Sequence, residues 1–159
     1  MIDELMRNEE LSEIVADHAA ELIGFLLDSN VEFSVVCNIQ EVAFDPPLPE
    51  KIASGFKQFA LFLLSGYALE SADMDDDMLF LIFEAGFGSE NFGSTVSVPT
   101  DAILQISVDG TVIFVNLCAQ PQYRPKTQHG GGRESGEATV DKSLKVFMDN
   151  PQNKPLLKK

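Results

Sequence analysis

The chain has 159 residues, enough for one domain with a single core, and its 25 acidic and 11 basic residues give a formal net charge of −14. This acidity argues against a nucleic-acid partner, because binding to a phosphate backbone requires clustered Lys and Arg. No apolar run is long enough to cross a bilayer, residues 1–5 lack a signal-peptide pattern, and the separated Cys37 and Cys118 are typical of reduced, buried thiols. We therefore expect a soluble, cytoplasmic protein with no membrane partner.

The first predicted element is a helix over residues 9–28. Asn8 suits its N-cap, and Glu9 and Glu10 place negative charge on the first turn, where the helix dipole favours it. One stripe recurs at three- and four-residue steps: Leu11, Ile14, Val15, His18, Leu22, Phe25 and Leu26. Further apolar residues widen this face, so the helix either packs entirely on the body or also pairs with a second copy. We favour a homodimer centred on Ile14, His18 and Leu22.

The middle of the chain is rich in strand patterns. Residues 31–39 alternate apolar and polar side chains, as a half-buried antiparallel strand does. Residues 56–64 and 78–83 are apolar on both faces. A brief helical segment is expected from Pro99 to Ile106, and Asp109-Gly110 predicts a tight hairpin turn. The remaining expected strands cover residues 56–64, 78–83, 95–98 and 111–116. We predict a mainly β (α+β) fold, a small antiparallel SH3-like or Sm-like open barrel with an N-terminal helix.

The charge is divided unevenly along the chain. Residues 1–118 carry 21 acids and three bases, a net charge of −18, whereas residues 119–159 carry eight bases and four acids, a net charge of +4. The later segment is rich in Gln, Pro, Gly, Lys and Arg, which is the composition of a linker. We therefore predict a folded domain over 1–118 and a flexible tail over 119–159 with an apolar, basic tip.

Catalytic and metal motifs are not convincing in this chain. The acids between Asp73 and Glu84 imitate the spacing of a calcium loop but place Met78 where that loop needs Gly. The glycines of Gly86-Phe87-Gly88 are not followed by a dinucleotide-binding pattern, and neither His18 nor His129 has partners at metal-ligand spacing. No nucleophile elbow is present. We expect a protein without catalytic residues, metal or cofactor.

Several segments carry a resemblance to a known family. They are Leu26–Asn30, Phe59–Ala68, Phe83–Gly88 and, most specifically, Val96–Ile106, which contains Val-Ser-Val-Pro followed by Ala-Ile-Leu-Gln-Ile. Over about residues 15–116 the chain resembles the stringent starvation protein B (SspB) family, adaptors that deliver ssrA-tagged proteins to the ClpXP protease. The basic, apolar tip is similar to the peptide with which that family docks on the N-terminal domain of the ClpX unfoldase.

The resemblance implies a non-enzymatic adaptor without a cofactor. Its peptide-binding groove would be formed by Leu61, Leu63, Phe83, Glu84, Ala85 and Phe87. Its ClpX-docking tip would be Pro155, Leu156, Leu157, Lys158 and Lys159. Its partners would be ssrA-tagged or similar peptides, the ClpX N-terminal domain and a second copy, since the family dimerises through its first helix.

One departure from the family lies in the expected groove, where Gly86 replaces an Arg. A more acidic groove favours a tag that carries Lys or Arg. Two alternatives stay open from the sequence: an acidic secretion or holding chaperone that binds extended polypeptide, and a small-molecule-binding barrel. The chaperone would not need the basic Leu-Leu tip.

Overall fold

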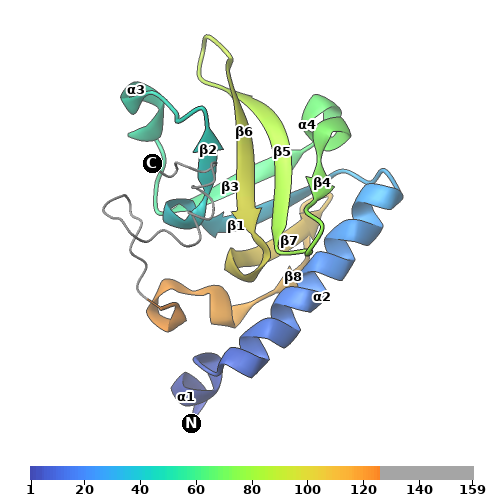
Figure 1. The fold of residues 1–159 in the computed structure, drawn as a ribbon, viewed down its shortest axis with the longest axis vertical. Helices are drawn as coiled ribbons and strands as arrows, with labels where there is room; N and C mark the ends of the chain where they lie inside the picture. The colour runs from blue at the N-terminus through green and yellow to red at the C-terminus, as the bar shows by residue number, and fades with distance from the viewer. Residues whose placement is uncertain (126–159) are drawn as a thin grey trace. The chain divides into compact units, whose positions relative to one another are not determined.

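The computed structural model describes residues 1–125, shown as a ribbon in Figure 1. Helix α1 (Ile2–Met6) is followed by the long helix α2 (Glu9–Asp28), whose N-cap Asn8 accepts a hydrogen bond from the Leu11 N–H with its side chain. The predicted helix over residues 9–28 is therefore confirmed. The other helices are α3 (Glu50–Ala53) and α4 (Gly66–Ser71), with short 3-10 helices η1 (Ile39–Glu41), η2 (Thr100–Ala102), η3 (Leu117–Ala119) and η4 (Pro121–Tyr123).

The strands of the described residues form two antiparallel sheets. The first has the order β3 (Phe59–Leu64), β1 (Phe33–Asn38), β7 (Ile103–Val108) and β8 (Thr111–Val115). The second has the order β2 (Ala43–Asp45), β6 (Phe92–Pro99), β5 (Phe80–Phe87) and β4 (Asp73–Met74). This confirms a small, mainly β α+β fold with an N-terminal helix. Its strands are divided between two four-stranded sheets, each with two edge strands.

The core lies between the sheets and α2. Strand β1 contributes Phe33, Val35 and Cys37 at alternate positions, and α2 contributes Ala19 and Ile23, all at most 1% exposed. Because side chains alternate across a strand, one face of each sheet supplies this interior and the other faces outward. In Figure 1, α2 lies along one side of the sheets, next to β4.

The predicted helical segment from Pro99 to Ile106 is confirmed only over Thr100–Ala102 and is wrong from Ile103 onward. Strand β6 continues to Pro99, a single 3-10 turn follows over Thr100–Ala102, and β7 begins at Ile103. Ile103 and Ile106 are completely buried, and β7 pairs with both β1 and β8. Sheet pairing and burial therefore override the local helical tendency of this segment.

The predicted domain boundary also needs correction. The folded unit extends from Met1 to Arg124, so residues 119–124 belong to it and not to the tail. Ala119 is completely buried, and Tyr123 donates a hydrogen bond from its hydroxyl to Asp3 at 2.8 Å. Arg124 forms ion pairs with Glu41 and Asp101. Few of these residues are apolar, and the anchoring contacts are polar ones that a linker-like composition conceals.

None of the helices that the structure describes is both long and apolar enough to cross a membrane.

Candidate functional site

The six predicted groove residues do not share one surface. Leu61 and Leu63 lie on β3, with exposed fractions of 62% and 60%, whereas Phe83 lies on β5 and is only 1% exposed. The β3 side chains that face the interior are those at even positions, Ala60, Phe62 and Leu64. The structure therefore does not bring the six residues together, because Leu61 and Leu63 lie on the outer row of β3 whereas Phe83 is buried in the interior.

Aromatic rings from both sheets meet at the inner face instead. Phe62 of β3 lies against Phe83 of β5, with ring centroids 5.8 Å apart, and Phe44 of β2 meets Phe87 edge-on at 5.7 Å. Phe56, between α3 and β3, contacts Phe62 and Phe87 at 6.3 and 6.2 Å. Such tilted and edge-to-face arrangements are the favoured ones for aromatic pairs. The result is a continuous aromatic cluster that joins the two sheets.

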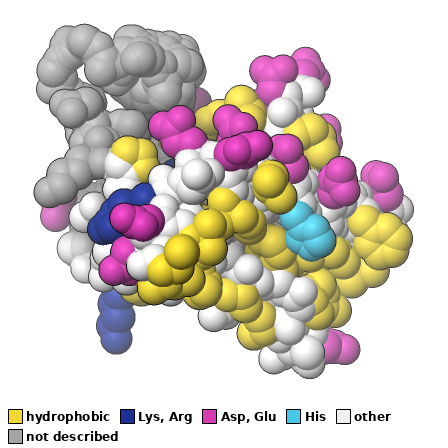
Figure 2. Space-filling view, turned by 90° about the horizontal axis from the view of Figure 1, so that it is seen from below, with side chains coloured by type: hydrophobic (Ala, Val, Ile, Leu, Met, Phe, Trp, Pro, Cys, Tyr) yellow, Lys and Arg dark blue, Asp and Glu magenta, His cyan; other side chains and the backbone are white. Residues whose placement is uncertain are grey.

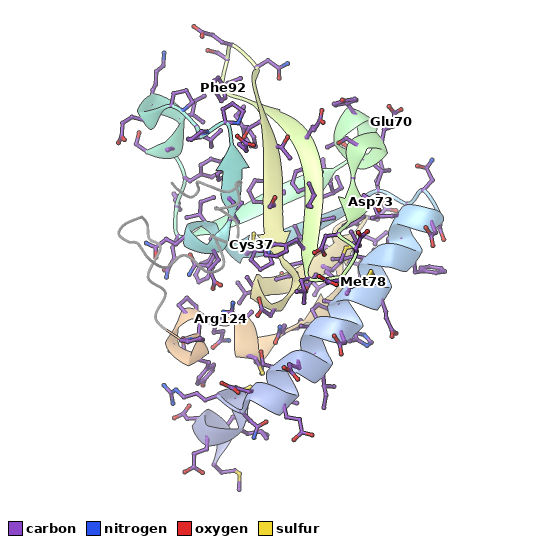
Figure 3. The ribbon with its side chains drawn as sticks, in the orientation of Figure 1. Cys37, Glu70, Asp73, Met78, Phe92 and Arg124 are labelled. Carbon is purple, nitrogen blue, oxygen red and sulfur yellow. The ribbon has the colours of Figure 1, made fainter. Side chains whose placement is uncertain are left out.

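This cluster is open to solvent at one end, in a cleft of about 420 Å³ between α3 and the turn that joins β5 to β6. Phe56, Phe87 and Phe92 contribute aromatic surface to its lining, α3 contributes Ile52, and one base and one acid, Lys51 and Glu90, also line it. Figure 3 labels Phe92 at the turn end of β6, the end of the sheet where α3 lies. An open, largely apolar cleft with a single charge of each sign suits an apolar side chain or a short peptide.

Two glycines shape the β5–β6 turn, which forms one side of the cleft. Gly88 has a φ of +76°, and a Cβ there would lie 3.1 Å from the Ile52 side chain, so the β5–β6 turn packs closely on α3. A Cβ at Gly86 would overlap the Asn91 side chain, which lies over that position. Gly86, the departure from the family pattern, therefore leaves room for the Asn91 amide in this turn.

Glu84 points away from the aromatic cluster. Its backbone N–H donates a hydrogen bond to Ser71 Oγ at 2.9 Å, and its carboxylate accepts one from the Tyr67 hydroxyl at 2.7 Å. Both partners come from α4, which therefore covers the edge of β5 at this point. The hydrogen bond to Glu84 and the charge of its carboxylate raise the pKa of Tyr67 above its usual range. Ala85 is half-buried and packs with Phe87 against the core.

The predicted dimer residues lie together on α2. Ile14 is 59% exposed, His18 is exposed and stacks on Phe114 of β8 at 5.5 Å, and Leu22 is half-buried against the core. Phe25, 63% exposed, continues the same face. In Figure 2 the His side chain drawn in cyan, which is His18, borders a run of hydrophobic side chains drawn in yellow. This arrangement gives an exposed apolar surface at the place where the sequence predicts an interface.

The predicted docking tip, residues 155–159, lies outside the described residues, as does His129. Among the residues described, no group of three or more His, Cys, Asp and Glu side chains is placed to hold a metal ion. Comparison of the chain with protein-family models, curated proteins and solved structures finds no match. The chain's own residues are therefore the basis for assigning it a function.

Sequence reasoning missed Phe56 and Phe92 as cleft residues. The sequence does contain a signal for Phe92, because Phe87 and Phe92 flank a turn that contains Gly88 and Asn91. In the structure, Phe87 and Phe92 are direct partners across β5 and β6. For Phe56, which precedes β3, the sequence contains no comparable signal, since its position depends on α3 folding back over the turn.

Proposed function

We propose that the chain is a non-enzymatic adaptor that binds an ssrA-type or similar peptide in the aromatic cleft and tethers it to the ClpX unfoldase for degradation. The observation that carries the proposal is the open apolar cleft at Phe56, Phe87 and Phe92. An open aromatic cleft of this size can accept the apolar side chains of a short peptide.

The peptide site in this proposal is the cleft and not the six-residue groove expected from the sequence. Phe87 belongs to both, and Ala85 packs beside it. Phe83 has an indirect role, because its buried ring packs against Phe62 and thereby supports the wall of the cleft. Leu61, Leu63 and Glu84 lie elsewhere on the molecule and have no role in the cleft.

Tethering to ClpX is assigned to Leu156 and Leu157, as apolar contacts, and to Lys158 and Lys159, as basic ones. A short peptide of this kind binds weakly by itself, but linkage raises its effective concentration to about the millimolar range. A homodimer formed through Ile14, His18 and Leu22 would supply two tails and two clefts. Partnership with ClpX would place the adaptor in the cytoplasm.

The adaptor proposal is tested by the degradation rate of a dilute ssrA-tagged fluorescent reporter by ClpXP, with and without this protein. We expect faster degradation with the full chain and no acceleration with a chain that ends at Asn153, because the tether is lost. In parallel, fluorescence anisotropy of a labelled tag peptide measures peptide binding in the absence of ClpX. Phe92→Ala should weaken peptide binding at least about tenfold, since an aromatic anchor is removed.

Leu79→Ala is the matched control, because Leu79 is 55% exposed and does not line the cleft. It should leave peptide binding and degradation unchanged. No acceleration by the full chain would sink delivery of that tag to ClpXP. The dimer is tested separately by sedimentation, where Ile14→Asp should convert a dimer to a monomer, and a monomeric parent chain would refute the interface.

The alternative, an acidic holding chaperone, is favoured by a second exposed apolar surface on β3, at Phe59, Leu61 and Leu63. A chaperone would suppress aggregation of an unfolded client equally well with and without residues 154–159. The truncated chain therefore separates the two functions: it retains full activity as a chaperone and loses activity as an adaptor.

A further inference from the structure

Strand β3 exposes a row of large apolar side chains outside the cleft. Phe59, Leu61 and Leu63 alternate along its outer face, with exposed fractions of 46%, 62% and 60%. Three residues after the strand ends, Tyr67 is 63% exposed. Single exposed apolar residues are ordinary, but a contiguous row on one strand marks an interaction surface.

Within residues 1–125, the same strand is an edge of its sheet. Among the described residues β3 pairs only with β1, in a register that is continuous from Phe33 and Leu64 to Asn38 and Phe59. Alternate backbone N–H and C=O groups of an edge strand point away from its neighbour and are free to pair with another chain. Proteins usually block such edges with Pro, a charged residue or a bulge, but the sequence Phe-Ala-Leu-Phe-Leu-Leu contains no Pro or charge, and its pairing has no bulge.

The opposite edge of the same sheet provides a contrast. Strand β8 also exposes apolar residues, including Val112 and Val115, but its pairing with β7 is interrupted by a register shift between Ile106 and Ser107. Such an irregularity bends and twists an edge and makes it a poorer template for strand addition. Of the two edges, β3 is therefore the one suited to accept a strand.

Charge identifies the kind of partner. Residues 1–125 contain 21 acids and four bases, so their field attracts a basic partner at long range. Near the C-terminal end of the row, Tyr67 holds the Glu84 carboxylate by a hydrogen bond of 2.7 Å, and Glu70 is exposed one turn further along α4. A Lys or Arg beyond the apolar contacts would meet these carboxylates.

We infer that β3 binds an extended polypeptide segment as an added strand, one that is apolar at alternate positions and carries Lys or Arg at the end near Glu84. Backbone pairing with the strand edge supplies affinity, and the alternate apolar side chains contact the row of Phe59, Leu61 and Leu63. This surface is distinct from the cleft, and its function does not depend on delivery to ClpX.

The test uses a fluorescein-labelled peptide that alternates valine with serine and ends in a pair of lysines, measured by anisotropy against the full chain. Leu61→Asp should weaken binding at least about tenfold, because it places a charge in the centre of the row. Val112→Asp is the matched control, on the same sheet but on β8, and should leave binding unchanged. Thermal unfolding of both variants checks that each remains folded, as their exposed positions lead us to expect.

Three further comparisons make the inference specific. A peptide with its valines grouped at one end should bind more weakly than the alternating one, and so should a peptide ending in glutamates. Glu84→Gln should weaken the lysine peptide about two- to fivefold and leave a serine-ended peptide unaffected, as expected for one solvent-exposed charge pair. Hydrogen exchange should slow at β3 amides on binding and remain unchanged at β8.

Equal binding of the alternating and grouped peptides, or equal losses from Leu61→Asp and Val112→Asp, would overturn the inference. A third outcome would also overturn it: the parent chain is a dimer, it binds none of the peptides, and Leu61→Asp dissociates the dimer. In that case a second copy would occupy β3. Phe92→Ala should leave this binding intact. Failure of the cleft assay and failure of the β3 assay are therefore distinguishable.

Discussion

The inner and outer rows of β3 are both apolar, but the inner row is buried and the outer row is exposed to solvent. Phe62, on the inner row, is 5% exposed and contacts four other rings, those of Phe44, Phe56, Phe83 and Phe87. Leu61, its neighbour in the chain, is 62% exposed. Both rows are wholly apolar, so hydrophobicity does not distinguish core from surface on this strand. What distinguishes them is the direction in which each side chain leaves the sheet.

The largest effect that tests this comparison is on stability. Phe62→Ala removes a ring from the aromatic cluster and should lower the free energy of unfolding by about 3–5 kcal/mol, because a buried ring leaves a cavity as well as losing its apolar contacts. Leu61→Ala should change the same quantity by no more than about 0.5 kcal/mol. Urea denaturation followed by circular dichroism measures both. Similar losses for the two variants would mean that the outer row is covered in the isolated protein.

The sequence was sufficient for the elements that depend on local patterns. Alternation over residues 31–39 predicted β1, and Asp109-Gly110 predicted the β7–β8 turn, where both residues have the positive φ values that such a turn requires. The long helix was predicted from its periodicity and its Asn8 cap. In each case the residues that specify the element lie within it or next to it.

The candidate site was less predictable because it depends on contacts between distant segments. An entirely apolar strand indicates burial on both faces, and nothing in the sequence of β3 shows that it is an edge strand, which only the pairing order of the sheet decides. The groove expected from the resemblance accordingly grouped Leu61, which lies on the outer row, with the buried Phe83. The cleft itself requires α3 to pack on the β5–β6 turn through Ile52 and Gly88, a contact with no local signal.

An effect of intermediate size concerns the Arg124 clamp, the two ion pairs from Arg124 to Glu41 and Asp101 that join the two sheets. Arg124 bridges Glu41, on the connection from β1 to β2, and Asp101, on the connection from β6 to β7, and each connection passes from one sheet to the other. Burial alone would lower the pKa of Arg124, but hydrogen bonds and the charges of Glu41 and Asp101 raise it above its usual range, so the side chain stays charged. Figure 3 labels Arg124 near the end of the folded unit.

Arg124→Gln should lower the free energy of unfolding by about 1–3 kcal/mol, the range for hydrogen bonds to charged groups, measured by urea denaturation. Because the clamp joins the sheets, we expect weaker peptide binding in the cleft and unchanged binding at β3, which belongs to one sheet. Lys57→Gln, an exposed base outside the clamp, serves as the control. If a chain ending at Cys118 were as stable as one ending at Pro125, the clamp would contribute nothing to the folded unit.

The smallest effect concerns the Glu84 carboxylate and the titration of Tyr67, which holds it by a hydrogen bond. The chain has two tyrosines and no Trp, so in a Tyr123→Phe background the absorbance of the phenolate at alkaline pH reports Tyr67 alone. The Tyr67 hydroxyl donates to Glu84, which raises the pKa of Tyr67, and Glu84→Gln should therefore shift its titration to lower pH. Because the folded-state pKa is raised, the stabilisation from this hydrogen bond is complete below the pKa of an unfolded tyrosine and is lost as pH rises through the folded value. Glu90→Gln, which removes a carboxylate from the cleft, should leave the titration unchanged. An unshifted titration in Glu84→Gln would mean that Glu84 is not held beside the row, and the expected preference of β3 for a basic peptide would lose its physical basis.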